Sequence, residues 1–376
     1  MRSATDPQAR APGMPEDGRT GAPERSRAAV LVTGAAGFLG FHVARALLAR
    51  GEHVLGIDRL GGPEPALAAA RLSRLEAMQG FTFRRVELAE DGALDRAVAG
   101  AGIGRAVHLA GHAGLRGADG PSLVRDNVLA QARVLEFSRR RGAVHLVHAS
   151  SAAVHGGPGM APAPVSAYGA TKRRAEILAR EAARAGGPPV TLLRLFTLYG
   201  PWSGSGSAAR IFADAILDGR SARLHGHGRM RRSFTFVEDA AAATLAALDR
   251  PPPPDADGAP YAVADVRHPA ATGLEAFVDV LEALLGRRAR RERVPAMRGE
   301  VMSDVPEDGA RPVPCHVAPT GIRDGLARFV AWHLAVGRGL AGEPDVGLWR
   351  ARRRRSILKT SPSPPDVEES RMTDNW

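Results

Sequence analysis

The sequence predicts an α/β protein built on a doubly wound parallel sheet. Short apolar runs, the first of them Val30–Val32, alternate along the chain with stretches of helical periodicity, as in a parallel sheet covered by helices on both faces. Three glycines directly follow the first run, and Asp58 ends the second. Polar residues follow several further runs, at the positions where the carboxyl ends of parallel strands form one edge and bind ligands. We therefore expect a ligand site along that edge.

The segment Val30–Asp58 carries the strongest pattern. It reads VLVTGAAGFLGFHVARALLARGEHVLGID, in the order strand, glycine turn, helix, strand and acid. This is the βαβ unit with which Rossmann sheets bind dinucleotides. Gly34 and Gly37 let the turn close and the backbone approach a pyrophosphate, Gly40 lets the helix pack tightly, and the free N–H groups of the helix point at the anion. The alternative is an ordinary α/β turn that contains glycines by chance.

Asp58 predicts which dinucleotide binds. A carboxylate 18 residues after Gly40 would bind the adenosine ribose 2′-hydroxyl and repel a 2′-phosphate, which favours NAD over NADP. The neighbouring Arg59 favours the opposite choice. The first gap between the glycines is one residue longer than in G-x-G-x-x-G.

The next elements of the sheet follow in order. The predicted strands are Phe81–Val86, Arg105–Ala110 and Val144–Ser150. The predicted helices are a segment from the loop Arg59–Pro65 to about Met78, then Ala93–Val98 and Val124–Arg140.

A tyrosine and a lysine follow the last of these strands. Tyr168 and Lys172 are four residues apart at the start of a predicted helix, so they project from one face. A nearby ammonium favours the phenolate and lowers a tyrosine pKa toward the range of a general base. Ser151, directly after the strand, could hold a substrate oxygen. A surface Tyr/Lys pair is the alternative, but the dinucleotide unit and the serine-bearing strand favour catalysis.

Composition limits the classes of function. The chain has 376 residues, is 44% hydrophobic and 24% charged, and lacks an apolar run that could span a bilayer, as expected of a soluble globular protein. Its N-terminus lacks the order of a signal peptide. The single cysteine, Cys315, excludes an internal disulfide and fits the cytoplasm. His225 and His227 lack partners with metal-site spacing, so no metal is expected.

The formal net charge of +11 raises nucleic acid as a partner. Part of that charge is an arginine cluster at residues 350–355, for which a solvated tail is the favoured interpretation. We expect a disordered N-terminal segment at 1–27, an NAD-binding Rossmann domain at 28–195, a substrate-binding lobe at 196–340 with a segment near 234–248 that returns to the sheet, and a disordered basic, proline-rich tail at 341–376.

Several longer motifs point to a family. Between Ala29 and Gly337 the chain carries VLVTGAAGFLG, HLAGHAGLR, ASSAAVHG, YGATK, LRLFTLYGPW and GRMRRSFTFVED. With these motifs it resembles the extended short-chain dehydrogenases/reductases, specifically the NAD-dependent epimerase/dehydratase family and, within it, the UDP-glucuronate 4-epimerases. LRLFTLYGPW and GRMRRSFTFVED are the motifs specific to nucleotide-sugar epimerases.

The resemblance implies a role for individual residues. The catalytic residues would be Ser151, Tyr168 and Lys172. NAD would be bound by Gly34, Gly37, Phe38, Leu39, Gly40, Asp58, Glu87, Leu88, Leu109, Ala110, Gly111, Tyr168 and Lys172. The nucleotide sugar would be bound by Arg116, Phe196, Thr197, Arg232 and Glu300, with Arg232 on the UDP pyrophosphate; a surface arginine is the alternative for Arg232.

The chain also departs from the family pattern. The serine-rich ASSSSVYG reads ASSAAVHG, so Ala152, Ala153 and His155 replace two hydroxyls and a tyrosine. The segment Ser203–Ser207 replaces Gly-Arg-Pro-Asp-Met and removes an arginine expected near the sugar carboxylate. Because a buried carboxylate without a partner is costly, either Arg116 compensates or the sugar carries no carboxylate. The alanines after Ser151 also argue against dehydratases and decarboxylases, which carry an acid there.

The resulting expectation is an NAD-dependent 4-epimerase of a UDP-sugar, UDP-glucuronate or a relative, that acts in polysaccharide biosynthesis in the cytoplasm. The resemblance implies a homodimer through helices near Val124–Arg140 and Tyr168–Arg184, and neither a membrane nor nucleic acid is expected as a partner. Two alternatives remain open. One is an NAD(P)-dependent reductase or dehydrogenase of another small molecule, and the other is a diverged NAD-binding protein with little catalysis.

Overall fold

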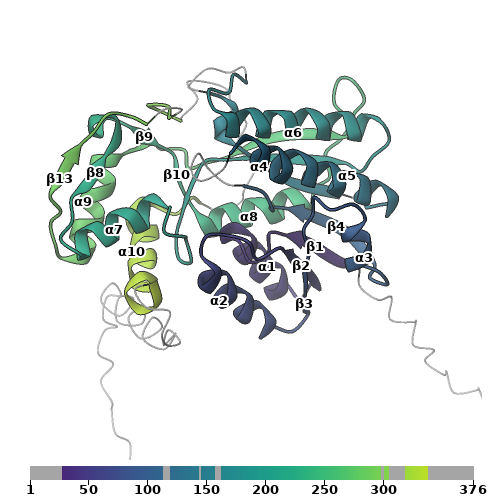
Figure 1. Ribbon diagram of the computed structural model, residues 1–376, viewed down its shortest axis with the longest axis horizontal. Coiled ribbons are helices and arrows are strands. Elements are labelled where there is room, and N and C mark those ends of the chain that lie inside the picture. The colour runs from purple at the N-terminus through teal and green to yellow at the C-terminus, as the bar shows by residue number, and fades with distance from the viewer. Residues whose placement is uncertain are drawn as a thin grey trace, which may run out of the picture.

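The computed structural model describes residues 28–112, 119–143, 145–156, 162–297, 300–304 and 318–337. A large lobe with the main sheet lies beside a smaller lobe (Figure 1). In the part of the chain that is described, seven strands form one sheet in the order β11-β6-β5-β4-β1-β2-β3, with every neighbouring pair parallel. The expected doubly wound parallel sheet is therefore confirmed.

The strands of this sheet are β1 (Ala29–Thr33), β2 (Val54–Asp58), β3 (Phe81–Arg85), β4 (Ile103–His108), β5 (His145–Ser151), β6 (Val190–Leu195) and β11 (Tyr261–Val266). The strand order reverses at β1, because β2 and β4 lie on either side of it. The loops after β1 and β4 therefore diverge at their carboxyl ends and open a crevice there, which is where doubly wound sheets bind ligands.

Two sets of helices cover the sheet. On one face lie α1 (Phe38–Ala49), α2 (Pro65–Glu76) and α8 (Val237–Leu248), and on the other α3 (Ala93–Ala97), α4 (Gly120–Val124), α5 (Ala130–Arg140) and α6 (Ala167–Arg184) (Figure 1). A π-helical turn, Arg125–Leu129, joins α4 to α5. Because helices cover both faces, the central strands β1, β4 and β5 are almost fully buried.

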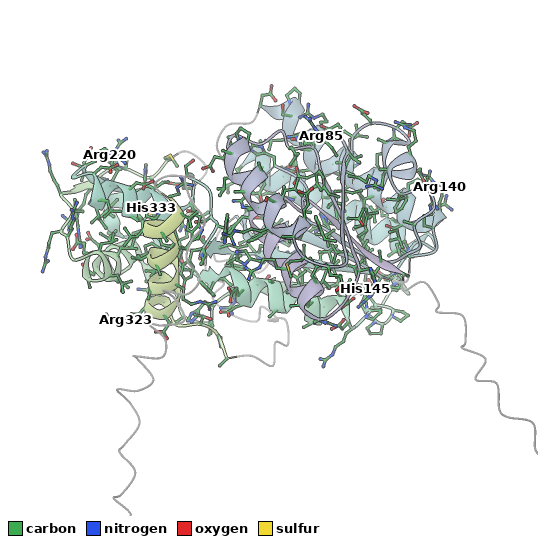
Figure 2. All side chains as sticks on the ribbon, turned by 90° about the horizontal axis from the view of Figure 1, so that it is seen from below. Arg85, Arg140, His145, Arg220, Arg323 and His333 are labelled. Atoms are coloured by element: carbon green, nitrogen blue, oxygen red, sulfur yellow. The ribbon has the colours of Figure 1, made fainter. Side chains whose placement is uncertain are left out.

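The smaller lobe is built from short elements after β6. They are β7 (Thr197–Tyr199), α7 (Ala208–Leu217), β8 (Ala222–Leu224), β9 (Arg231–Arg232), β10 (Phe234–Phe236), β12 (Thr272–Gly273), α9 (Leu274–Leu285), β13 (Arg291–Arg293) and α10 (Ile322–Trp332). The pair β10–β7 is parallel and leads directly into α8 of the large lobe. In Figure 2, His333, just after α10, lies in the small lobe, whereas Arg140 and His145 lie in the large one.

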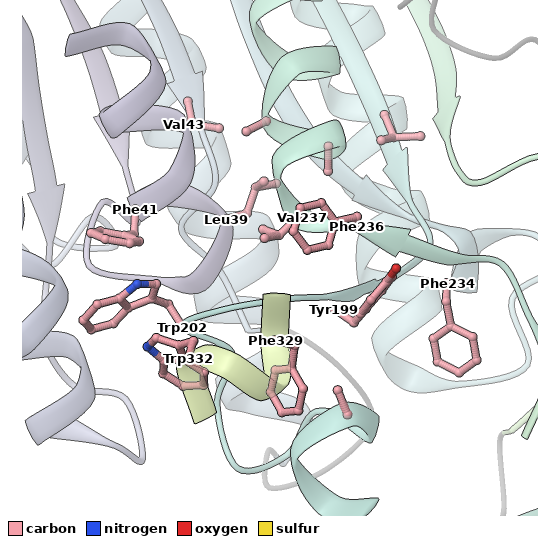
Figure 3. Packing of buried hydrophobic residues seen from close by; sticks show 14 of the residues in the cluster. Leu39, Phe41, Val43, Tyr199, Trp202, Phe234, Phe236, Val237, Phe329 and Trp332 are labelled. Carbon is pink, nitrogen blue, oxygen red and sulfur yellow. The ribbon is translucent and has the colours of Figure 1, made fainter. Parts of the chain in front are cut away.

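Aromatic side chains join the two lobes. The Trp202 ring lies 5.2 Å from Phe41 of α1 and 5.7 Å from Trp332 of α10, centroid to centroid (Figure 3). Trp202 holds a positive φ of 69°, which is unfavourable for a bulky residue unless the surroundings impose it. His42 helps to hold this conformation, because its ring Nε2 forms a hydrogen bond of 3.0 Å with the carbonyl oxygen of Pro201. The large lobe and the segment Gly200–Trp202, called the GPW segment below, are thus packed as one hydrophobic core.

Most predicted elements are confirmed to within a few residues. Strand β11 was not predicted, although it pairs with β6 along its whole length. The predicted helix Val124–Arg140 begins earlier, at Gly120, and contains the π-helical turn. The expected disordered segments at 1–27 and 341–376, and Cys315, lie outside the described residues. Among the helices that are described, none has the length and apolar character needed to cross a membrane.

Candidate active site at the carboxyl edge of the sheet

The glycine turn after β1 packs backbone against backbone. A Cβ on Gly34, whose φ is 70°, would lie 2.7 Å from the backbone nitrogen of Ala110, and one on Gly40 would overlap the carbonyl oxygen of Gly34. Only glycine fits such positions. Helix α1 begins directly after Gly37, which provides no side-chain cap. The free N–H groups of the first turn are therefore left for an anion.

Asp58 is fixed at the end of β2. Its carboxylate accepts hydrogen bonds from the backbone N–H of Ala36 at 3.2 Å and of Leu60 at 2.9 Å. The guanidinium of Arg59 turns away to Asp126, at 2.8 Å, and Glu87, at 3.2 Å. Because two carboxylates hold it, the Arg59 guanidinium is not directed at Asp58, the acid predicted to select a 2′-hydroxyl.

A cavity of about 260 Å³ extends from Asp58 to the end of β4. Eight residues predicted to bind NAD line it, namely Gly34, Gly37, Asp58, Glu87, Leu88, Leu109, Ala110 and Gly111. Phe38, Leu39 and Gly40 do not line it; Leu39 belongs to the hydrophobic core behind the turn. A glycine cradle for a pyrophosphate, a carboxylate for a ribose and an apolar far wall together fit NAD.

Arg71 of α2 is a lining residue that the sequence analysis missed. Its buried guanidinium donates to the carbonyls of Ala36, at 2.9 Å, and Trp202, at 2.5 and 3.2 Å. Burial lowers the pKa of Arg71 to about 10. The side chain thus ties the glycine turn to the GPW segment of the other lobe. A single arginine on an amphipathic helix gave no signal for this role, because both of its acceptors are backbone atoms distant in sequence.

The two serines at the end of β5 face opposite ways, as successive strand residues do. The hydroxyl of Ser150 donates to Glu176 of α6 at 2.7 Å, and Glu176 is also paired with Arg194. Ser150 is therefore part of a buried structural network. Ser151 is half-buried, and its Oγ accepts the backbone N–H of Ala153 at 3.2 Å.

Tyr168 and Lys172 lie in the first two turns of α6, which Ser166 caps by accepting the N–H of Gly169. The Lys172 ammonium is buried and donates to the carbonyl of Ala149 in β5 at 3.1 Å. Burial lowers the pKa of Lys172 to about 8. A Cβ on Gly111 would lie 3.5 Å from its Nζ, so the ammonium lies beside a residue that lines the cavity, although Lys172 and Tyr168 are not lining residues themselves. Tyr168 is half-buried on the same helix.

Two buried histidines lie beneath this edge. The rings of His108 on β4 and His148 on β5 stack with centroids 4.9 Å apart. Burial, and then the charge of Lys172, lower the pKa of His108 to about 3; burial first also places that of His148 well below its ordinary value. Both rings are neutral at physiological pH and leave the ammonium as the local charge.

The residues predicted to bind the sugar nucleotide are less tightly grouped than those predicted to bind NAD. Phe196 is buried, with its ring 6.4 Å from that of His155. Thr197 donates its hydroxyl to Asp304 at 3.3 Å, and the half-buried Arg232 donates to the Met302 carbonyl at 3.4 Å. The Glu300 carboxylate accepts the backbone N–H of Met297. Arg116 lies outside the described residues.

The altered segments are ordered parts of the structure. Ala152–Val154 form a 3₁₀ turn after Ser151. In the segment that replaces the family's arginine, the N–H of Ser205 donates to Glu64 at 2.9 Å, and Glu64 also pairs with Arg210. Because Glu64 lines the dinucleotide cavity, this substituted loop is anchored to the cofactor side. Among the described residues no group of three His, Cys, Asp or Glu could hold a metal ion.

Comparison with known proteins agrees with this geometry. Residues 30–260 match the NAD dependent epimerase/dehydratase family. A probable UDP-glucuronate 4-epimerase of Rhizobium meliloti (strain 1021) is 33% identical over 335 residues, which cover 81% of this chain and 96% of the relative. Protein CapI of Staphylococcus aureus is 30% identical over 334 residues, covering 81% and 98%.

Two solved structures are similar over nearly their whole length. UDP-glucuronic acid 4-epimerase from Bacillus cereus, in complex with UDP-glucuronic acid and NAD, has a TM-score of 0.72 and 27% identity and covers 81% of this chain and 98% of its own. MoeE5 in complex with UDP-glucose and NAD has a TM-score of 0.69 and 29% identity, with coverages of 81% and 98%. The matched family, the shared fold and a cavity shaped for the cofactor lead to one conclusion: the chain belongs to the NAD-dependent epimerase/dehydratase family, and its cofactor is NAD.

Proposed function

We propose that this protein is an NAD-dependent 4-epimerase of a UDP-sugar, with Tyr168, Lys172 and Ser151 as its catalytic residues. One observation carries the proposal. The Lys172 ammonium, one helical turn from Tyr168, lies beside Gly111, which lines the same cavity as Asp58. A sugar held between Tyr168 and the nicotinamide end of this cavity would be in reach of both a base and the cofactor.

Each residue has a physical task in this reaction. Bound NAD supplies the acceptor and the donor of the C4 hydride. Tyr168, as phenolate, takes the proton of the 4-hydroxyl, and the Lys172 ammonium favours that phenolate. Ser151 donates a hydrogen bond to the same sugar oxygen. After the transient ketone has turned over in the pocket, Tyr168 returns the proton while the hydride is delivered to the other face.

The relatives support the nucleotide-sugar class. A UDP-glucuronic acid 4-epimerase and MoeE5 were crystallised with UDP-sugars and NAD, and both share the fold over most of this chain. We propose that Arg232 binds the UDP pyrophosphate, since a guanidinium suits paired phosphate oxygens. Phe196 and Thr197 would face the sugar. We further propose a homodimer that pairs the α4–α5 and α6 helices of two subunits.

The decisive experiment removes the hydroxyl group of Tyr168. Tyr168→Phe deletes the proposed base and should lower kcat by about 10²–10⁴-fold while NAD remains bound. The measurement is interconversion of UDP-sugar epimers by NMR, with NAD content determined after denaturation. Tyr261→Phe is the matched control, because its hydroxyl makes a long 3.4 Å bond to the Glu176 carbonyl, away from the cavity. It should retain activity.

Two outcomes would contradict the assignment. Full activity of Tyr168→Phe would exclude Tyr168 as the base. Net consumption of NADH with a carbonyl substrate, without interconversion of any UDP-sugar, would instead identify a reductase.

A further inference from the structure

A carboxylate that the sequence analysis did not select lies at the sugar end of the site. Asp304 accepts the hydroxyl of Thr197 at 3.3 Å through one oxygen and the backbone N–H of Ser233 at 2.8 Å through the other. It is half-buried. Burial raises the pKa of Asp304, and the Ser233 N–H and the charge of Arg232 oppose that rise. A partly buried carboxylate with a raised pKa, beside residues expected to bind the substrate, is a candidate for a functional role.

The register of the sheet places this carboxylate near the reacting edge. Ser151 and Leu195 are directly paired across β5 and β6, and Thr197 follows Leu195 by two residues. The Cα atoms of Ser151 and Thr197 are therefore no more than about 12 Å apart. A hexose with its substituents spans that gap, so a sugar whose reacting oxygen meets Ser151 reaches Thr197 and Asp304.

Among the described residues, the contact between Thr197 and Asp304 presents acceptors to a ligand. Because Thr197 donates its one hydroxyl proton to Asp304, it offers a ligand only lone pairs. Asp304, when ionised, can only accept. The backbone N–H of Ser233 is already used by Asp304. A sugar group that bonds to Thr197 or Asp304 must therefore donate the hydrogen bond, as a hydroxyl does and a carboxylate does not.

The neighbouring cation, Arg232, is not paired with this carboxylate. Arg232 donates to the carbonyls of Arg231 and Met302, and within the described residues it forms no ion pair with a carboxylate. In the proposed complex its charge is matched by the pyrophosphate. The segment Ser203–Ser207, where the family pattern has an arginine, contains only serine and glycine. A uronate would therefore meet Asp304 without a compensating cation from Arg232 or from Ser203–Ser207, and Arg116, the other candidate, lies outside the described residues.

We propose that Asp304 is a specificity-determining residue that selects UDP-hexoses with an uncharged hydroxymethyl group at C5 and rejects the corresponding uronates. This inference rests on the proposed function, because it takes the UDP-sugar to lie between Ser151 and Thr197. Asp304 and Thr197 together accept hydrogen bonds from the sugar hydroxyls, and the Asp304 charge repels a sugar carboxylate.

The test compares UDP-glucose with UDP-glucuronate on the NAD-loaded full chain. Calorimetry gives Kd for each ligand, and NMR gives kcat/KM for epimerisation. Wild-type protein should favour UDP-glucose at least about tenfold in Kd, because two like charges a few ångströms apart repel strongly in a partly buried site. Asp304→Asn keeps an acceptor for the Ser233 N–H and removes the charge. It should reduce that preference by about tenfold, mainly through tighter UDP-glucuronate binding.

A charge-matched control separates the local effect from a change in net charge. Asp218→Asn removes an exposed carboxylate of the same lobe, which pairs with Arg220 at 3.2 Å, and should leave the ratio of the two Kd values unchanged. Thermal unfolding of Asp304→Asn checks that the variant is folded. Should the variant fail to fold, Asp304→Ser, which keeps a side-chain oxygen and removes the charge, takes its place in the same comparison of the two Kd values.

Each result bears on a distinct claim. Wild-type preference for UDP-glucuronate, or a ratio that Asp304→Asn leaves unchanged, overturns the specificity role. Binding of UDP-glucose without epimerisation overturns the proposed reaction and leaves the specificity role standing on the Kd ratio. Absence of binding by both UDP-sugars overturns both proposals.

Discussion

The cofactor end of the site and its proposed sugar end are built in different ways. At the cofactor end the glycine turn approaches Ala110 so closely that a single added Cβ would contact backbone atoms. At the sugar end, Thr197, Arg232 and Asp304 sit on two- and three-residue strands or on a loop, and they meet through side chains. One end is shaped by main-chain geometry and the other by exchangeable side chains.

This difference explains why the cofactor is easier to predict from the sequence than the sugar substrate. Side chains can be replaced without moving the backbone, whereas a backbone contact such as that between Gly34 and Ala110 tolerates only glycine. The chain keeps the cofactor pattern and departs from the family at Ala152, Ala153 and Ser203–Ser207. The family and NAD are therefore established, and the sugar is a proposal.

The largest effect is expected at the cofactor end. Gly40→Ala introduces a Cβ that overlaps the Gly34 carbonyl oxygen, so the turn and α1 must separate. We expect a loss of about 3 kcal/mol or more in the free energy of unfolding and a protein purified without NAD. Denaturant unfolding and NAD content are the measurements.

The matched control for that variant is Gly62→Ala. Gly62 lines the same cavity, but no atom lies within 4 Å of its Cβ position. Stability should change by less than about 0.5 kcal/mol. If Gly40→Ala behaved like Gly62→Ala, the close backbone approach would not be what shapes the cofactor end.

The next largest effect is expected at Lys172, which lies between the cofactor end and the proposed sugar end. Lys172→Met should lower kcat by about 10²-fold or more, because the Tyr168 phenolate loses its neighbouring cation. In the wild type, the Lys172 ammonium loses its proton as the pH rises through about 8. The charge that supports the phenolate is thus present below that pH and lost above it. Activity should decline above about pH 8.

Lys172→Arg tests the origin of that alkaline decline. A guanidinium stays charged throughout the range, so the decline should move to higher pH in whatever activity the variant retains. A pH–rate profile with an unchanged alkaline limb would assign the decline to another group.

A smaller effect is expected for cofactor choice. Asp58→Ala removes the acceptor proposed for the ribose hydroxyl and should weaken NAD binding by about 10- to 100-fold, with a smaller loss for NADP. Fluorescence titration of both cofactors measures the ratio. Asp95→Asn on α3, whose carboxylate pairs with Arg140 outside the cavity, should leave both affinities unchanged. Equal losses of NAD and NADP affinity in Asp58→Ala would exclude its selective role.

The smallest effect on the site is expected from substitutions on the surface near α4 and α6. Val165, just before α6, and Val124, at the end of α4, are large apolar side chains that are 58% and 52% exposed, and they lie beside the helices that we propose to pair in the dimer. Val165→Asp should shift the proposed dimer toward monomer in sedimentation velocity, with little change in NAD content. A wild-type protein that is monomeric at micromolar concentration would contradict the dimer.

Local patterns predicted much of the fold. The glycine turn, Asp58, and the pair Tyr168 and Lys172 were found because their signals are short-range and depend on backbone geometry. Strand β11 was missed because it is held by pairing with β6, more than sixty residues earlier in the chain. The homodimer and the domain boundaries stay predictions.

The sequence by itself determined the family, the cofactor and the parallel sheet, because helix and strand periodicity and glycine spacing act within about thirty residues. Only the tertiary structure brought Arg71 to the glycine turn, turned Arg59 toward Asp126, and placed Asp304 against Thr197, 107 residues away. Those contacts depend on how the two lobes and their short strands pack, and no local pattern specifies which side chains then meet. The tertiary contacts, not the motifs, are what support a proposal about the sugar.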